Sequence, residues 1–343
     1  MAHINKVVQP VVKTLAQRVD GVVDTGPVIP DWLDDSDLVG AYSLYDLYGL
    51  GNSIMQLSGQ GGTQRIDFTQ AEYENINSDG KGLPTNLTVV DKLYNQVPGS
   101  SNSDLSETAG NLSYRPSVAF RPYNRFDHVL FDAAGQYTGQ LLSMSNLSNL
   151  SLGFDHDVTF IVVAQNNMSG NDPNSSYPFV AGFQYAESMG LSVDDDFRAL
   201  TVVDTAGPMF MQARSHDNSI SGSQATGSTS SYFVSSFGTY AGTFKAKNDS
   251  NNTCDERKMY STTSSTADLV LYGTSSTDVS FLGTSTDTNA YQFLSVGARR
   301  GGFVPASNQD RIDMDFKALL VFKKVMTLDE INTVADGLRG VVL

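Results

Sequence analysis

The stretch that decides the fold is Met314-Asp315-Phe316-Lys317-Ala318-Leu319-Leu320-Val321-Phe322, near the end of the chain. In an extended backbone, successive side chains point to opposite faces. One face of this run then carries Met314, Phe316, Ala318, Leu320 and Phe322, and the other carries Asp313, Asp315, Lys317 and Lys323. This alternation predicts a β-strand with one buried face.

Outward from this run, short apolar or alternating segments recur along the chain, bounded by Gly, Asn, Asp and Ser. Many short strands joined by turn-rich loops predict an all-β sandwich or jelly roll. The predicted strands are Ile66–Phe68, Thr88–Tyr94, Ser117–Arg121, Val158–Gln165, Phe179–Phe183, Ala199–Asp204, Met209–Ala213, Tyr232–Lys245, Asp268–Tyr272, Gln292–Gly297 and Met314–Val325.

One short helix is predicted directly after the last strand. Thr327 and Glu330 form a Ser/Thr-x-x-Glu capping box, in which each side chain accepts a backbone N–H at the helix start. Gly340 is the expected stop of this helix. An apolar stripe runs between them, formed by Leu328, Ile331, Val334 and Leu338.

Composition excludes several classes of function. The chain has 343 residues, 40% apolar and 17% charged, and a formal net charge of -15. That charge repels phosphate backbones, so nucleic acid and anionic membrane surfaces are poor partners. Cys254 is the only cysteine, so no intrachain disulfide and no cysteine-based zinc site can form. No apolar run approaches the roughly 20 residues of a membrane-spanning helix, so no membrane insertion is expected.

Residues 1–36 are predicted to be an arm that docks on a partner, in extended or helical form. Its apolar residues recur at near-helical spacing, but Pro10 interrupts the pattern. A flexible leader is the alternative interpretation. The segment lacks the pattern of a secretory signal, so synthesis in the cytoplasm is expected. The predicted docking residues are Val7, Val8, Val11, Val12 and Leu15.

Several stretches, taken in order, indicate a family. They are Ala41-Tyr42-Ser43-Leu44, then Leu93-Tyr94-Asn95-Gln96-Val97-Pro98-Gly99, then Arg115-Pro116, and finally the runs 293–297, 316–322 and 326–331. This order resembles concanavalin A-like (laminin-G-like) jelly-roll domains, which are common in tailed-phage particle proteins. A version of the domain forms the sandwich of fungal α-L-arabinofuranosidases.

The resemblance implies a concanavalin A-like sandwich over residues 37–343, with a family-specific N-terminal extension at 37–127 and the main sandwich at 128–343. Two departures concern the second motif, where Asn95 stands in place of the usual Asp, and Val97-Pro98 in place of the Ser. A role of that loop in binding is therefore not carried over.

Catalysis is not expected. A glycosidase needs two carboxylates about 5–9.5 Å apart, and only six glutamates occur in the chain. In the arabinofuranosidase branch, the resemblance implies an acid shortly after the strand at 292–297. Here Ala298-Arg299-Arg300-Gly301-Gly302 occupies that stretch, and a guanidinium group cannot serve as a general acid.

Cofactors are not expected, apart from one calcium hypothesis. Asp194, Asp195 and Asp196 offer the oxygen ligands that calcium prefers, although adjacent acids in so acidic a chain are usually a solvated turn. For glycan binding, no single residue is singled out. Tyrosines near predicted loops that could stack on sugars are Tyr123, Tyr177, Tyr185, Tyr232, Tyr240 and Tyr291.

These observations predict a non-catalytic virion structural protein: a capsid decoration, head fibre or tail appendage that docks by its arm and displays the sandwich outward. The expected partners are other virion proteins, other copies of the chain in a homo-oligomer, and host surface glycans. The expected location is the virion. A glycan-binding adhesin is the alternative, and a glycoside hydrolase is the least favoured hypothesis.

Overall fold

In the computed structural model of the chain, the arm residues Val7 to Leu15 lie outside the described part. The structure describes residues 29–59, 65–72, 87–100, 102–106, 116–121, 125–131, 140–153, 156–166, 179–186, 196–202, 209–214, 237–246, 253–262, 268–276, 279–280, 291–297, 300–301, 304–305 and 312–342.

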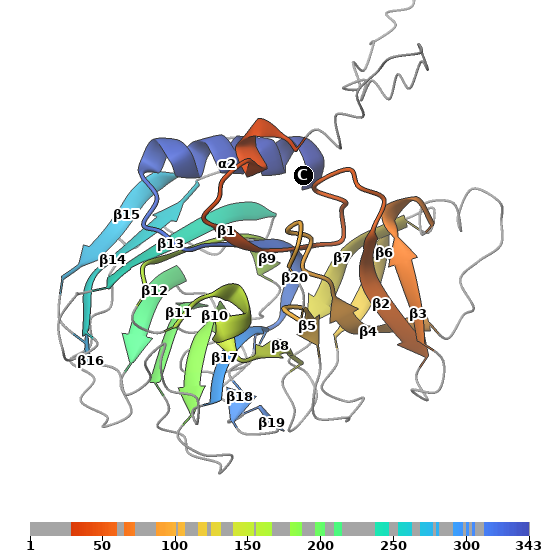
Figure 1. The fold of residues 1–343 in the computed structure, drawn as a ribbon, viewed down its shortest axis with the longest axis horizontal. Helices are drawn as coiled ribbons and strands as arrows, with labels where there is room; N and C mark the ends of the chain where they lie inside the picture. The colour runs from red at the N-terminus through yellow and green to blue at the C-terminus, as the bar shows by residue number, and fades with distance from the viewer. Residues whose placement is uncertain are drawn as a thin grey trace, which may run out of the picture.

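Two layers of antiparallel strands form the molecule (Figure 1). One layer, here called the outer sheet, lies beneath the C-terminal helix. From edge to edge it consists of β15 (Val270–Ser275), β14 (Thr253–Ser261), β13 (Gly238–Ala246), β9 (Val158–Asn166), β20 (Met314–Phe322) and β1 (Leu38–Ser43).

The second layer, here called the inner sheet, is longer and continues into a small strand cluster around β2. Its order is β12 (Met209–Arg214), β11 (Asp196–Val202), β10 (Phe179–Ala186), β17 (Tyr291–Val296), β8 (Leu142–Ser145), β5 (Leu105–Ser106), β4 (Leu87–Leu93), β2 (Ser53–Gly59) and β3 (Arg65–Thr69).

Two strands join the layers. β6 (Ser117–Arg121) pairs with β4, and β7 (Arg125–Phe131) pairs with β6 and with the start of β20. The remaining short elements are η1 (Asp31–Leu33), η3 (Leu147–Leu150), β16 (Val279–Ser280), β18 (Arg300–Gly301) and β19 (Val304–Pro305).

The main core lies between the two layers. Phe160 of β9 and Phe183 of β10 meet edge to face, with ring centroids 4.9 Å apart, and both are fully buried. Aromatic pairs in this geometry add to the free energy of apolar burial. The prediction of an all-β sandwich with a short C-terminal helix is therefore confirmed.

A β-bulge in β20 changes the two faces that were predicted for this strand. Phe316 pairs with Ala164 of β9, but Ala318 pairs with Val163, so Lys317 is an extra residue. Beyond the bulge the faces exchange: Leu319 and Val321 enter the core between the sheets, whereas Ala318, Leu320 and Phe322 face the helix. The prediction of one apolar face was wrong, since β20 is buried on both faces.

A second core separates the outer sheet from α2 (Leu328–Val342), which crosses its outer face (Figure 1). The capping box is confirmed: Glu330 N donates to Thr327 Oγ1 (3.3 Å), and Thr327 N donates to Glu330 Oε2 (2.7 Å). Gly340 does not end the helix, which runs to Val342. The buried Lys317 ammonium donates to the Val342 carbonyl (3.0 Å) and holds this last turn on the sheet.

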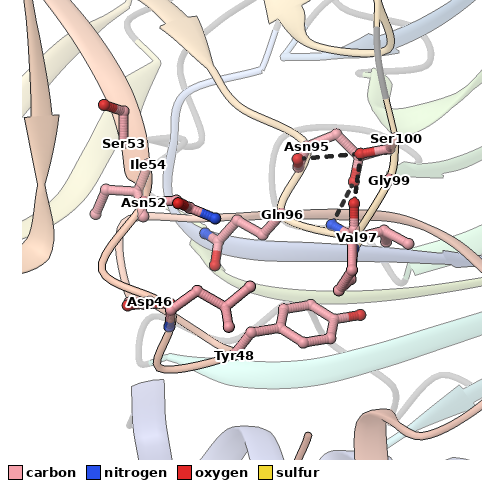
Figure 2. Close-up of a pocket in the computed structure, with 12 residues that line it drawn as sticks. Asp46, Tyr48, Asn52, Ser53, Ile54, Asn95, Gln96, Val97, Gly99 and Ser100 are labelled. Atoms are coloured by element: carbon pink, nitrogen blue, oxygen red, sulfur yellow. Dashed lines mark hydrogen bonds between the residues drawn. The ribbon is translucent and has the colours of Figure 1, made fainter. Parts of the chain in front are cut away.

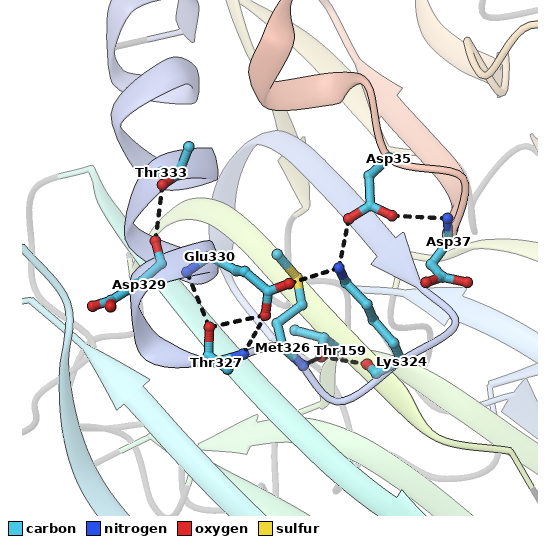
Figure 3. Close-up of polar contacts among 9 residues, drawn as sticks. All are labelled: Asp35, Asp37, Thr159, Lys324, Met326, Thr327, Asp329, Glu330 and Thr333. Atoms are coloured by element: carbon cyan, nitrogen blue, oxygen red, sulfur yellow. Dashed lines mark hydrogen bonds and ion pairs between the residues drawn. The ribbon is translucent and has the colours of Figure 1, made fainter.

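Polar contacts fasten α2 to the segment before β1 (Figure 3). Lys324 Nζ lies 2.7 Å from Asp35 Oδ2 and 2.8 Å from Glu330 Oε1. Thr159 Oγ1 donates to the Lys324 carbonyl and accepts from Met326 N. The residues after β20 are thereby tied to the segment before β1 and to the start of β9, the two strands that flank β20.

The predicted strands correspond to β3, β4, β6, β9, β10, β11, β12, β13, β15, β17 and β20, with shifted ends. Strands β1, β2, β7, β8 and β14 were missed. In β14, Arg257 is fully buried although charged, which hides the apolar pattern. No helix among the described residues is long and apolar enough to cross a membrane.

Candidate functional site

A polar pocket opens beside the small strand cluster, between the β1–β2 loop and the β4–β5 loop (Figure 2). Its volume is about 140 Å³. Pockets for drug-sized ligands usually measure about 300–1,000 Å³, so this one has room for a small ligand or one end of a larger one. Its polar lining residues include Asp46, Tyr48, Asn52, Ser53, Asn95 and Gln96.

Two amide side chains build the rigid wall of the pocket. Asn95 Oδ1 accepts the backbone N–H of Ala41 (3.0 Å), and its Nδ2 donates to the carbonyl of Val39 (2.9 Å). Gln96 Oε1 accepts from Leu47 N, and its Nε2 donates to the carbonyls of Ser43 and Tyr45. These bonds join loops about fifty residues apart, so the wall is fixed before any ligand arrives.

The opposite side of the pocket is a tight turn organised by Asp46. Its carboxylate accepts the backbone N–H groups of Leu50 (3.2 Å) and Gly51 (2.7 Å). Gly49 and Gly51 both have positive φ, near +65°, a conformation that side chains other than glycine rarely adopt. The turn therefore holds the carboxylate in one orientation against the pocket.

Two further side chains can face a ligand. Asn52 is exposed at the rim and Ser53 is half-buried, whereas Tyr48 borders the pocket (Figure 2) but is only 4% exposed and packs in the core beneath the C-terminal helix. Burial raises the pKa of Tyr48 to about 12, so its hydroxyl stays protonated at neutral pH. Together with Asp46, the side chains of Asn52 and Ser53 offer amide and hydroxyl donors and several acceptors, which suits a neutral polyhydroxylated ligand.

A polar cluster continues from the pocket along the exposed face of the small strands. Tyr94 OH and Gln56 Nε2 both donate to Asp67 Oδ1, at 2.6 and 2.8 Å. Lys92 lies 3.5 Å from Asp104 and 5.0 Å above the Tyr94 ring. Burial, and then the bond to Asp67, raises the pKa of Tyr94. These groups are mutually paired and give the pocket a firm polar border.

The structure brings together the motifs that carry the family resemblance. Ala41 to Leu44 fall in β1 and its end, and Asn95 donates to and accepts from this strand. The later motifs form β17, β20 and α2. Since the side chains of Asn95 and Gln96 bond to backbone, the second motif acts in this chain as a structural link.

The site residues predicted from the sequence are not the ones that form this pocket. Asp194 and Asp195 lie outside the described residues, and Asp196 begins β11. No group of three or more His, Cys, Asp or Glu side chains able to hold a metal occurs among the residues that the structure describes. Calcium at Asp194–Asp196 therefore stays a prediction.

Of the tyrosines considered for sugar stacking, Tyr123, Tyr177 and Tyr232 lie outside the described part of the chain. Tyr240 is fully buried in the core of β13, so stacking there is wrong. Tyr185 lies near the end of β10, and Tyr291 is the first residue of β17. Sequence reasoning missed Asp46, Tyr48 and Asn52. The signal was the polar, glycine-rich turn that follows β1.

Comparisons with solved structures give the class of fold. An arabinofuranosidase complexed with arabinofuranosyl-α-1,2-xylobiose matches 88% of this chain with a TM-score of 0.54 and 13% identity. A GH54 α-L-arabinofuranosidase soaked with a cyclic sulfate inhibitor matches 88% with a TM-score of 0.51 and 11% identity. The chain spans 62% of the length of these structures. No protein-family model and no curated protein sequence matches this chain.

These findings correct the functional expectation. The hypothesis of a non-catalytic virion structural protein was wrong, and so was the expectation that the chain is not an enzyme, because the matched structures reported above are arabinofuranosidases. The physical reason is that the shared motifs build the sandwich itself and so cannot distinguish its branches. Membership of the concanavalin A-like family, the virion partners, the virion location and the homo-oligomer stay predictions.

Proposed function

We propose that this chain is a carbohydrate-active β-sandwich that recognises glycans bearing arabinofuranosyl groups. The observation that carries the proposal is the likeness to arabinofuranosidase structures over 88% of the chain. Fold alone does not define a function, so the proposal also requires a suitable site.

The pocket supplies that support. Its wall is rigid, its volume suits one sugar residue, and its accessible groups include the Asn52 amide, the Ser53 hydroxyl and the Asp46 carboxylate. Within the described residues, Asp46 is the one carboxylate of the pocket wall. A two-carboxylate hydrolysis would need a second acid from elsewhere, and recognition is therefore the activity assigned to this pocket.

The test is a binding measurement on the full chain with arabinofuranosyl-α-1,2-xylobiose, by isothermal titration calorimetry. In parallel, release of 4-nitrophenol from 4-nitrophenyl α-L-arabinofuranoside reports turnover. We expect saturable binding that weakens several-fold in Asn52→Ala, because that exposed amide loses its contacts with the sugar. Asn149→Ala is the matched control, since Asn149 is exposed and lies outside the pocket wall.

Turnover by the wild-type chain would support the proposal, because hydrolysis requires recognition. Absence of both binding and turnover would contradict it. If Asn52→Ala and Asn149→Ala weakened binding of the trisaccharide equally, recognition would have to occur outside this pocket.

A further inference from the structure

The charge of the pocket wall has a consequence for which sugars can enter. Asp46 contributes a carboxylate, and none of the twelve lining residues is Lys, Arg or His. Lys92, in the polar cluster beside the pocket, lies 3.5 Å from Asp104 and is outside the lining. The whole chain carries a net charge of -15. The potential in the pocket is therefore negative, and an anionic ligand meets like charge.

The Asp46 carboxylate cannot turn away from such a ligand without loss. Its two oxygens hold the N–H groups of Leu50 and Gly51, and Gln70 Oε1 accepts the backbone N–H of Asp46 itself (2.6 Å). A carboxylate has about four acceptor positions, so two remain for hydroxyl donors. The group is thus held in place with acceptor capacity left over.

Size adds a second restriction. A pocket of about 140 Å³, with one side closed by the bonded Asn95 and Gln96 side chains, has room for one sugar residue. The residue that can enter without its neighbours is the one at a chain end or on a side branch.

We propose that the pocket selects a neutral terminal sugar residue and rejects the anionic form of the same residue, with Asp46 as the specificity-determining side chain. This inference rests on the proposed function, because it assigns the ligand class of the same pocket. Neutral hydroxyls donate to the fixed carboxylate, whereas a sugar carboxylate can only repel it.

The test compares three probes that differ only at one carbon of the terminal sugar. They are arabinofuranosyl-α-1,2-xylobiose, the same trisaccharide with the primary hydroxyl of its arabinose oxidised to a carboxylic acid, and the methyl ester of that acid. The full chain should bind the neutral trisaccharide at least about ten-fold more tightly than the acid. The methyl ester, which has the bulk without the charge, should recover most of the difference.

Two perturbations then assign the effect to Asp46. In Asp46→Asn, the ratio of the dissociation constant of the acid to that of the neutral trisaccharide should fall toward one, even if both affinities change. Asp329→Asn is the matched control, since it removes the same charge from the exposed start of α2 and should leave the ratio unchanged. In the wild-type chain, raising the salt from about 0.05 M to about 1 M should also narrow the ratio by screening.

The outcomes separate the two proposals. Binding of neither probe overturns the proposed function, and this inference with it. Equal binding of the neutral and acidic probes, or a ratio of their dissociation constants that a folded Asp46→Asn variant leaves unchanged, overturns the inference alone. If Asp46→Asn fails to fold, the salt dependence and the methyl ester in the wild-type chain still decide it.

Discussion

At the scale of single residues, the contacts of Asn95 explain why this chain departs from the motif of the domains that it resembles in sequence. Its Oδ1 accepts from Ala41 N and Val97 N, and its Nδ2 donates to the Val39 carbonyl and to Ser103 Oγ. An aspartate could accept both backbone bonds, but its second oxygen would face the Val39 carbonyl. An amide is therefore required here, and the substitution is part of how the pocket wall is built.

Asn95→Asp is expected to lower the free energy of unfolding by about 1–3 kcal/mol, because a carboxylate oxygen replaces a bonded donor. Urea denaturation followed by tryptophan fluorescence measures the change. Asn52→Asp, at an exposed position of the same pocket, serves as the control and should cost under about 0.5 kcal/mol. Equal effects of the two substitutions would show that Asn95 is not the link described here.

At the scale of elements, the stability that the start of α2 gives to the fold depends on pH. The Lys324 ammonium donates a hydrogen bond to Glu330 Oε1 (2.8 Å), and this bond has the largest effect on the pKa of Glu330. The backbone N–H of Thr327 adds to the effect, and the pKa falls from 4.5 to about 2. Because the pKa is lower in the folded chain, Glu330 stabilises the fold above about pH 4.5. That contribution is lost as the pH falls from about 4.5 to about 2.

The side chain of Glu330 is 42% exposed, so solvent screening limits its contribution to about 1 kcal/mol. We expect Glu330→Gln to be less stable than the wild-type chain by this amount at pH 7, and the difference to vanish near pH 2. Denaturation at a series of pH values gives the comparison. If the difference in unfolding free energy between Glu330→Gln and the wild-type chain stayed constant across the pH series, ionisation of Glu330 would be excluded as its cause.

The two glycines inside α2 make a matched pair. A Cβ on Gly337 would overlap the ring of Trp32, which packs against the helix, whereas a Cβ on Gly340 would meet nothing within 4 Å. Gly340→Ala should stabilise the protein by about 1 kcal/mol through helix propensity. Gly337→Ala should destabilise it despite the same propensity, because the ring must move. Thermal denaturation of both variants tests this, and a stabilising Gly337→Ala would refute the Trp32 contact.

Sequence patterns predict elements better than they predict contacts between elements. The alternation of residues 314–322 indicated a strand, and the capping box indicated where α2 begins. The bulge at Lys317 could not be predicted, because one extra residue exchanges the two faces only through pairing with β9. The pocket could not be predicted either, because its two loops meet only through side-chain bonds of Asn95 and Gln96.

At the scale of the whole molecule, the predicted boundary at residues 127 and 128 divides strands that share a sheet. β1 pairs with β20 along Ala318 to Phe322, and β7 continues along the same edge of β20. β4 also reaches the inner sheet through β5 and β8. Residues 37–127 are therefore integral to the sandwich that the structure describes.

We expect a chain starting at residue 128 to fail to fold, because removing β1 exposes one long edge of β20 and the apolar side chains beneath it. A chain starting at residue 29 is the control and should keep the β-rich circular dichroism spectrum and a cooperative thermal transition. A soluble, cooperatively folded 128–343 fragment would contradict this prediction.

The position of β20 also has a consequence for how the protein is made. Strand β20, which lies between β9 and β1 in the outer sheet, follows all the other described strands in the sequence. On the ribosome, β1 and β9 emerge before β20 and remain without their shared neighbour until residues 314–322 have been made. Closure of the sandwich therefore waits for β20. The nascent chain carries two incomplete sheet edges meanwhile, which is the interval in which chaperones would protect it from aggregation.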